Sequence, residues 1–248
     1  MQSPLPHDNR AVPLVFDRPL AIVGGGSVDP VLLQELAARH VALVAADGGA
    51  DIVAAAGLVP EAIIGDLDSL SDRAGWESRT RVIHIAEQIT TDFQKALYST
   101  SAPVTLALGM TGKRLDHTLV ALSALHEVAH ERRVILVDEV DVALSVSGPF
   151  SFAAAAGERI SVHPLVPIRF LHSAGLQYKL DDLLLDPVGR LGMSNAGTGE
   201  LVEILPADAT PWLLILGRER LWDLVAAAQG DEALSPLPLE GRVAPLGP

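Results

Sequence analysis

The 248-residue sequence contains no cysteine, which excludes disulfide bonds, thiolate metal sites and cysteine nucleophiles. It is also poor in basic residues, with 18 Lys and Arg against 31 Asp and Glu and a formal net charge of −13. This charge opposes general binding to nucleic acid or anionic lipid. An anionic ligand would therefore need local basic residues or a metal ion.

Long apolar runs are missing as well. No run approaches the ~20 residues of a membrane-spanning helix. The N-terminal segment lacks a basic stretch followed by an apolar stretch and a small-residue cleavage site, so we expect no signal peptide. These absences predict a soluble cytoplasmic protein that does not bind a membrane.

The balance of 49% hydrophobic and 20% charged residues is typical of a folded protein, and the length favours two domains. Between residues 20 and 138, short apolar runs alternate with helical periodicity, which predicts a parallel sheet covered by helices. The expected strands are Leu20–Val23, Val41–Ala45, Ala62–Ile64, Val82–Ile85, Val104–Leu108 and Val134–Val137. The expected helices are Pro30–Arg39, Ala50–Ala56, Asp92–Thr100 and Asp116–Glu131.

After Asp138 the pattern changes to short segments of β type bounded by turns. These are Val140–Val146, Arg159–His163, Ile168–His172, Gly189–Ser194, Leu201–Leu205 and Trp212–Leu216. The predicted fold is an N-terminal, Rossmann-like α/β/α domain over residues 20–138, followed by an antiparallel β-sandwich over 139–217. We expect residues 1–19 to form an N-terminal extension, and 218–248 to form a helix, Arg218–Gln229, followed by a loose tail.

Two glycine clusters follow expected strands. Gly24-Gly25-Gly26-Ser27 follows the first strand and Asp47-Gly48-Gly49 the second, at the sheet edge where open α/β folds bind ligands. The first cluster does not complete the dinucleotide-binding fingerprint, which argues against a dehydrogenase. A plain strand-to-helix turn explains it equally well.

The sharpest local signal is Gly65-Asp66-Leu67-Asp68-Ser69, directly after the third strand. In an extended chain, Asp66 and Asp68 would point the same way and suit Mg²⁺, which prefers oxygen ligands. The alternative interpretation is an Asx-rich turn with solvated carboxylates.

A third acidic position, Asp92, follows the next strand and opens a helix. Thr90, Thr91 or Asp92 would alternatively serve only to cap that helix. If the sheet is parallel, Asp92 emerges at the same edge as Asp66 and Asp68, and three carboxylates converge on a metal. For Lys95, one turn further on, a solvated position is slightly favoured over a phosphate ligand.

The loop Gly109–His117 contains glycines and two adjacent cations before a helix, which makes a plausible phosphate cradle. Its order and spacing are not those of a Walker A motif. In the alternative interpretation, Arg114 pairs with a surface carboxylate and Asp116 caps the helix. His117 is expected to have a structural, hydrogen-bonding role.

Taken in order, four motifs of the first half resemble the thiamine pyrophosphokinase family: Ala45–Asp51, Pro60–Leu70, Thr90–Leu97 and Gly109–His117. His172–Leu180 and Ser194-Asn195 are similar to that family's thiamine-side motifs. The resemblance spans about Leu20 to Leu216. It implies transfer of the pyrophosphoryl group of ATP to thiamine, with Mg²⁺ as cofactor and a homodimer whose site joins two subunits.

Carried over residue by residue, the resemblance implies three groups of site residues. The expected Mg²⁺ ligands are Asp66, Asp68 and Asp92, and the expected residues of the reaction site are these three together with Arg114. The expected ATP site contains Asp47, Gly48, Gly49, Thr91, Gly112, Lys113, Arg114, Asp116 and His117. The expected thiamine site contains Gln88, Tyr178, Ser194 and Asn195.

The chain departs from the family pattern at several positions. Lys113 replaces a glycine, Asp51 stands where asparagine is common, and Tyr178 stands where some members have tryptophan. The rival functions are a pyrophosphokinase for another hydroxymethyl compound such as a pterin, a phosphatase with Asp66 as nucleophile, and a nucleotide-binding module without turnover.

Overall fold

The computed structural model describes residues 14–230, which separate into two compact units. The first unit extends to Asp141 and omits Ala129–Glu131, which belong to the second unit together with the chain from Val142 onwards. Most of the expected N-terminal extension and all of the tail beyond Gly230 lie outside the described residues. Within residues 14–230, no helix is long and apolar enough to span a membrane.

The first unit is built on six parallel strands in the order β8-β7-β2-β3-β4-β5. Their bounds are β2 Leu20–Val23, β3 Ala42–Ala46, β4 Ala62–Gly65, β5 Arg81–His84, β7 Thr105–Leu108 and β8 Val134–Val137. All of these strands except the edge strand β5 are completely buried, as their continuous apolar sequences predict.

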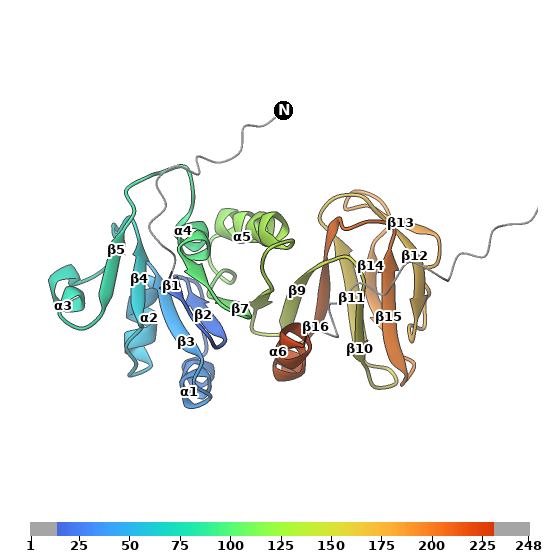
Figure 1. The fold of residues 1–248 in the computed structure, drawn as a ribbon, viewed down its shortest axis with the longest axis horizontal. Helices are drawn as coiled ribbons and strands as arrows, with labels where there is room; N and C mark the ends of the chain where they lie inside the picture. The colour runs from blue at the N-terminus through green and yellow to red at the C-terminus, as the bar shows by residue number, and fades with distance from the viewer. Residues whose placement is uncertain (1–13, 231–248) are drawn as a thin grey trace, which may run out of the picture. The chain divides into compact units, whose positions relative to one another are not determined.

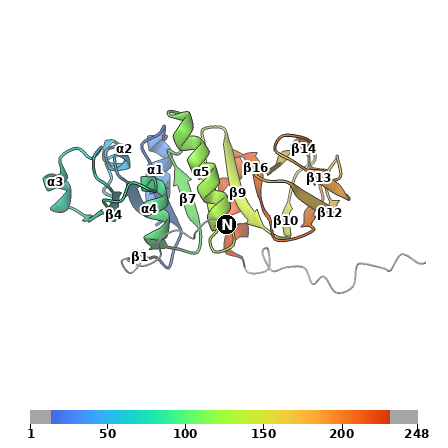
Figure 2. The ribbon, with the colours of Figure 1, turned by 90° about the horizontal axis from the view of Figure 1, so that it is seen from above.

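Helices cover both faces of this sheet. They are α1 Pro30–Ala38, α2 Gly49–Ala55, α3 Arg73–Glu77, α4 Asp92–Tyr98 and α5 Leu115–Val128. Figures 1 and 2 show α4 and α5 on one side of the strands and α1 and α2 on the other. This change of side follows from right-handed crossovers, because the chain moves outwards from β2 to β5 and then returns to β7 on the other side of β2. The strand order thus reverses between β2 and β7, where such sheets open a crevice at their carboxyl ends.

Three short elements of the first unit were not predicted. α3 follows the Asp66–Ser69 loop, and its N-cap Asp72 accepts a hydrogen bond from the backbone of Gly75. β1 (Leu14–Val15) pairs in parallel with β6 (Thr100–Ser101). Two-residue strands carry no periodicity, so only their tertiary pairing defines them.

The second unit contains two antiparallel arrangements of strands. One runs β14-β11-β16-β9 and the other β10-β15-β12-β13. The bounds are β9 Asp141–Ser147, β10 Phe150–Ala153, β11 Arg159–Pro164, β12 Ile168–Ala174, β13 Leu183–Leu185, β14 Gly192–Ala196, β15 Leu201–Pro206 and β16 Pro211–Gly217. Phe170 of β12 packs edge-on against Trp212 of β16 with ring centroids 5.7 Å apart, and both rings are fully buried.

The sequence-based boundaries in this unit are right for most strands and wrong in three places. β10 and β13 were not predicted, and the segment predicted from Gly189 begins as a strand only at Gly192 because Gly189 closes a turn onto Asp186. The terminal helix begins with a 3-10 turn, Arg218–Arg220, and continues as α6, Leu221–Gln229.

Candidate active site

A cleft of about 260 Å³ lies at the carboxyl ends of the parallel strands. Its walls come from the loops after β2, β3, β4 and β7 and from the first turns of α4 and α5. The lining residues are Gly24, Gly25, Gly26, Ala46, Asp47, Gly48, Ser69, Thr91, Asp92, Phe93, Gly109, Met110, Thr111, Lys113, Arg114, His117 and Ala121. The parallel topology therefore brings most of the predicted first-unit site residues to one edge, as expected from the sequence.

The glycine loop after β2 packs directly on the loop after β7. The backbone N–H of Gly26 donates to the carbonyl of Gly109 over 2.8 Å, and Lys113 Nζ donates to the carbonyl of Gly25 over 2.8 Å. A Cβ on Gly26 would lie 2.4 Å from the Gly109 oxygen, whereas a Cβ on Gly25 would meet nothing within 4 Å. Close backbone packing therefore explains the glycine at position 26.

We expect Gly26→Ala to distort the cleft and Gly25→Ala to leave it intact, because only the first adds an atom that overlaps backbone. Gly26→Ala should lower the free energy of unfolding by about 1–3 kcal/mol, the usual cost of overpacking, whereas Gly25→Ala should change it by less than about 0.5 kcal/mol. Urea unfolding of each variant measures this. Equal stabilities for the two variants would contradict the packing argument.

Three carboxylates from two loops meet beside this cleft, whose lining residues include Asp47 but not Asp66 or Asp68. One ligand atom from each of Asp47, Asp66 and Asp68 lies within 4.8 Å of the others. The expectation that the Asp66–Asp68 segment is extended is wrong, because Leu67 adopts a left-handed φ of +64° and Asp66 Oδ1 accepts a 3.2 Å hydrogen bond from the Asp68 N–H. The two carboxylates converge through an Asx turn and not through strand periodicity.

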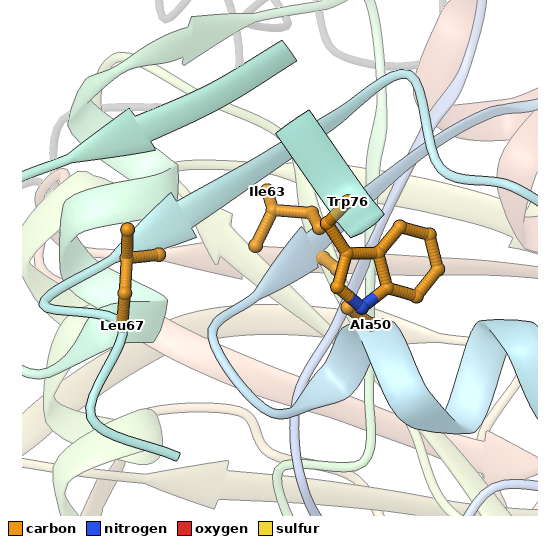
Figure 3. Packing of buried hydrophobic residues seen from close by; sticks show 5 residues of the cluster. Ala50, Ile63, Leu67 and Trp76 are labelled. Carbon is orange, nitrogen blue, oxygen red and sulfur yellow. The ribbon is translucent and has the colours of Figure 1, made fainter. Parts of the chain in front are cut away.

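The unusual backbone of Leu67 is held by its side chain. Leu67 is 9% exposed and belongs to an apolar cluster with Ala45, Ala50, Ile63 and Trp76. Figure 3 shows Leu67 on one side of Ile63, and Trp76 of α3 and Ala50 of α2 together on the other side. A left-handed leucine is strained and persists only where packing determines it, so this cluster fixes the shape of the carboxylate loop.

Asp47 is the least exposed carboxylate of the cleft, at 4%. Its Oδ2 accepts a 3.0 Å hydrogen bond from the Ser69 N–H, while its Oδ1 is buried with no hydrogen-bond partner among residues 14–230. Burial raises the pKa of Asp47, against the effect of the Ser69 hydrogen bond, and the charges of Asp92 and Asp68 raise it further. A buried carboxylate oxygen without a partner is costly unless a cation or proton compensates it.

Lys95 is buried, which corrects the solvated position favoured from the sequence. Its side chain is 1% exposed, and its Nζ lies 3.0 Å from Asp92 Oδ1 and 3.6 Å from Asp66 Oδ2. Burial lowers the pKa of Lys95, but the hydrogen bond and charge of Asp92 outweigh it, so the pKa is raised. Lys95 therefore remains positively charged next to the carboxylates of Asp66 and Asp92.

Asp92 lies at the same edge as Asp66 and Asp68 but is outside the group of three mutually close carboxylates. Its Oδ1 accepts hydrogen bonds from Lys95 Nζ and from the backbone N–H of Asp66 over 3.2 Å. Gln88 Nε2 donates to Asp66 Oδ2 over 2.8 Å, and this hydrogen bond is the main cause that lowers the pKa of Asp66.

These residues fit a divalent cation. The ammonium group of Lys95 pairs with Asp66 and Asp92, while Asp47, which is close to Asp66 and Asp68, has a buried oxygen with no hydrogen-bond partner among residues 14–230. Oxygen donors of this kind suit Mg²⁺, which takes one or two carboxylates and keeps the remaining positions for water or phosphate.

The start of α4 resolves which residue caps the helix. Thr91 is the N-cap and forms a capping box with Gln94, while Asp92 is in the first turn. The preceding loop is tied to Glu87, which accepts from the backbone N–H groups of Ile89 and Thr90 and from the Thr90 hydroxyl. Thr91 thus has a structural role as well as a place in the cleft wall.

The loop before α5 carries an exposed ion pair. Arg114 Nη2 lies 2.6 Å from Asp116 Oδ2, with side chains 68% and 63% exposed. Asp116 Oδ1 also accepts from the His117 N–H over 3.0 Å. This is the pairing anticipated as the alternative to phosphate binding, yet both Arg114 and His117 line the cleft and remain accessible to an anion.

The predicted thiamine-side residues of the second unit lie close together. Asn195 is 4% exposed, and its side chain forms two hydrogen bonds with the backbone of Tyr178. Its Nδ2 donates to the Tyr178 carbonyl over 2.6 Å, and its Oδ1 accepts from the Tyr178 N–H over 2.9 Å. The Tyr178 ring is left 64% exposed. Ser194 has a left-handed φ of +54° and donates its N–H to Ser161 Oγ.

Sequence reasoning missed two features of the carboxylate cluster. Asp47 was assigned to the ATP site only, although it follows a strand as Asp66 and Asp68 do, and that shared position was the available signal. The burial of Lys95 had a weaker signal: its position one turn after Asp92 on α4, the geometry of an i,i+3 pair.

Residues 33–137 match the protein family described as thiamin pyrophosphokinase, catalytic domain. The fold is similar to that of a thiamine pyrophosphokinase from Bacillus subtilis, with a TM-score of 0.68, 20% identity, and coverage of 81% of this chain and 99% of that one. For a thiamin pyrophosphokinase from Candida albicans the TM-score is 0.69 at 17% identity, and the match covers 81% of this chain and 89% of that one. For the yeast thiamin pyrophosphokinase the TM-score is 0.69 at 16% identity, and the match covers 87% of this chain and 95% of that one. No curated protein matches the chain.

Proposed function

Because residues 33–137 belong to the thiamin pyrophosphokinase family, we propose that this chain transfers the pyrophosphoryl group of ATP to the hydroxyl of thiamine, giving thiamine diphosphate and AMP. The observation that carries the proposal is the cluster of Asp47, Asp66 and Asp68 beside the cleft at the carboxyl edge of the sheet, inside the matched region. An acidic cleft with exposed Arg114 and Lys113 on its rim suits a metal-bound polyphosphate in a protein of net charge −13.

In this proposal the first unit is a Rossmann-like domain that binds ATP and Mg²⁺, and the second is a β-sandwich that binds thiamine. Asp66 and Asp68, with Asp92 beside them, hold Mg²⁺, which supplies neutralisation of charge on the phosphates. The loops after β3, β5 and β7, with the first turns of the helices that follow β3 and β7, bind the nucleotide through Asp47, Gly48, Gly49, Thr91, Gly112, Lys113, Arg114, Asp116 and His117. Thiamine is bound by Gln88, Tyr178, Ser194 and Asn195.

The reaction needs alignment more than covalent chemistry from the protein. Thiamine's hydroxyl oxygen forms a bond to the β-phosphorus of ATP, the bond from that phosphorus to the bridging α–β oxygen breaks, and AMP leaves. Arg114 is placed to orient phosphate oxygens from the cleft rim, and Gln88 to orient groups beside Asp66. The hydroxyl proton passes to a base that we leave open among Asp66, Asp68, Asp92 and Asp116.

Incubation of the protein with ATP, Mg²⁺ and thiamine tests the proposal directly. We expect AMP and thiamine diphosphate in equal amounts, with no product after chelation of the metal. A hydroxymethylpterin offered in place of thiamine examines the rival pyrophosphokinase. AMP release that does not depend on thiamine would refute the assignment.

We also propose, from the family resemblance, that the protein is a cytoplasmic homodimer. Analytical ultracentrifugation of the active protein would measure its oligomeric state.

Tyr178→Ala is expected to raise the KM for thiamine about 2- to 30-fold and to leave the KM for ATP unchanged. The reason is that an exposed aromatic face stabilises a cationic ring by about 0.5–2 kcal/mol. Tyr178→Phe keeps the face and is the matched control, with a thiamine KM close to that of the wild type. Steady-state kinetics with each substrate varied separately measures both. A shift in the ATP dependence alone would show that the second unit does not bind thiamine.

A further inference from the structure

The loop that follows β7 forms much of one wall of the cleft, yet it belongs to no helix or strand. Residues 109–114 include two glycines with a left-handed backbone, Gly109 at a φ of +68° and Gly112 at +85°. A segment with such glycines has many accessible conformations, so contacts with neighbouring elements must select one of them. The shape of this wall therefore depends on what anchors the loop.

Thr111, in the middle of this loop, is held from both sides. Its hydroxyl donates a hydrogen bond to Asp138 Oδ1, and its carbonyl accepts one from the Ser27 N–H over 3.4 Å. Asp138 directly follows β8, and Ser27 belongs to the glycine loop after β2; β8 and β2 are the two strands that flank β7 in the sheet. The loop after the central strand is thus bracketed by the segments that follow its two neighbours.

Asp138 is a well-fixed anchor for this loop. Its N–H donates to the Asp141 carbonyl over 2.9 Å, which holds the connection between β8 and β9. A hydrogen bond from a hydroxyl to a carboxylate is about twice as strong as one between neutral groups. The residues that line the cleft include Thr111 but not Asp138, so Asp138 acts on the cleft through Thr111.

The charge of Asp138 argues against direct contact with a phosphate. A carboxylate repels a polyphosphate, and in a protein of net charge −13 each further carboxylate near an anion site opposes binding. An aspartate at position 138 therefore weakens anion binding unless its hydrogen bond to Thr111 outweighs the repulsion. An anchored loop loses less conformational entropy when a ligand binds, and such preorganisation raises affinity.

We propose that Asp138 is a positioning residue for the nucleotide. Through Thr111 it fixes the loop that carries Lys113 and Arg114, so that both cationic side chains stand at the cleft in an arrangement ready for a polyphosphate. The inference rests on the proposed function, because it takes the occupant of this cleft to be ATP.

Calorimetric titration with ATP and Mg²⁺, in the absence of thiamine, tests the inference. We expect Asp138→Ala to weaken ATP binding at least about fivefold, because the carboxylate that anchors the loop is lost. Asp138→Asn keeps an acceptor oxygen and should bind ATP within about threefold of the wild type. Thr111→Val removes the same hydrogen bond from the other side and should lose as much affinity. The double variant Asp138→Ala/Thr111→Val should bind no more weakly than either single variant, because both remove one interaction.

Glu139→Ala is the matched control, since Glu139 is the exposed acidic neighbour of Asp138. It removes the same charge and should bind ATP as tightly as the wild type or more tightly. Loss of charge alone would likewise strengthen ATP binding in Asp138→Ala, whereas loss of the anchor weakens it, so the two effects have opposite signs. In turnover, Asp138→Ala should raise the KM for ATP and leave the KM for thiamine unchanged, a split that a general loss of stability does not produce.

A loss of ATP affinity below about fivefold in Asp138→Ala, or an equal rise of both KM values, overturns the inference. If circular dichroism shows that Asp138→Ala is unfolded, Thr111→Val decides by the same threshold. Because the titration contains no thiamine, a chain that binds ATP and loses affinity in these variants, but makes no thiamine diphosphate, would refute only the proposed function.

Discussion

Replacement of Lys95 by methionine is expected to destabilise the protein by about 2–4 kcal/mol, because it leaves carboxylates at the cleft without their counter-charge. Removal of one partner of a buried ion pair typically costs about 3–5 kcal/mol. The Asp66 and Asp92 side chains are 13% and 29% exposed, so water relieves part of that cost. Urea unfolding followed by circular dichroism measures the change.

The double variant Lys95→Met/Asp92→Asn separates charge from packing. If the uncompensated charge causes the loss, the second substitution should restore part of the stability. Lys179→Met is the control for loss of a lysine, because Lys179 is 67% exposed and lies 4.0 Å from Asp181. It should change the free energy of unfolding by less than about 0.5 kcal/mol. Wild-type stability in Lys95→Met would contradict the role given to the buried ammonium group.

Asp68→Asn is expected to lower turnover at least about 100-fold while the fold is retained. Asp68 is exposed, and asparagine can still accept the 2.9 Å hydrogen bond from Ser69 Oγ, so stability should hardly change. The charge that would bind the metal is lost, and even groups in the outer shell of a metal are worth about 10- to 100-fold. Rates of AMP formation at saturating ATP and thiamine measure the effect.

Asp72→Asn is the control for Asp68→Asn. Asp72 lies four residues further along and caps α3 with a left-handed φ of +44°, a conformation and a capping role that asparagine also suits. This variant should keep wild-type turnover. Full activity in Asp68→Asn would remove Asp68 from the metal site.

Local β patterns in the sequence predicted most, but not all, of the strands of the second unit. Val202, Ile204 and Pro206 of β15 alternate with less buried residues. Six strands of this unit were predicted, as short segments of β type bounded by turns. β13 is only three residues long, and its sequence Leu183–Leu185 does not alternate, so pairing with β12 alone makes it a strand.

The sequence by itself determined the order of the elements and the edge at which the site lies. Continuous apolar runs required strands buried on both faces, such strands pair in parallel, and parallel strands bring the residues after them to one edge. The placement of Asp66, Asp68 and Asp92 at a common edge follows from these local patterns without knowledge of any contact. The four motifs were enough to indicate the family whose catalytic domain residues 33–137 match.

Only the tertiary structure decided which of these carboxylates face one another and which are neutralised. The left-handed turn at Leu67 depends on packing in the apolar cluster with Ala45, Ala50, Ile63 and Trp76, and the buried position of Lys95 depends on contacts of α4 with the sheet. Asp47 reaches the cluster because Gly65 leaves room for it. Each of these features results from atoms distant in the chain competing for the same space, and local periodicity does not record such competition.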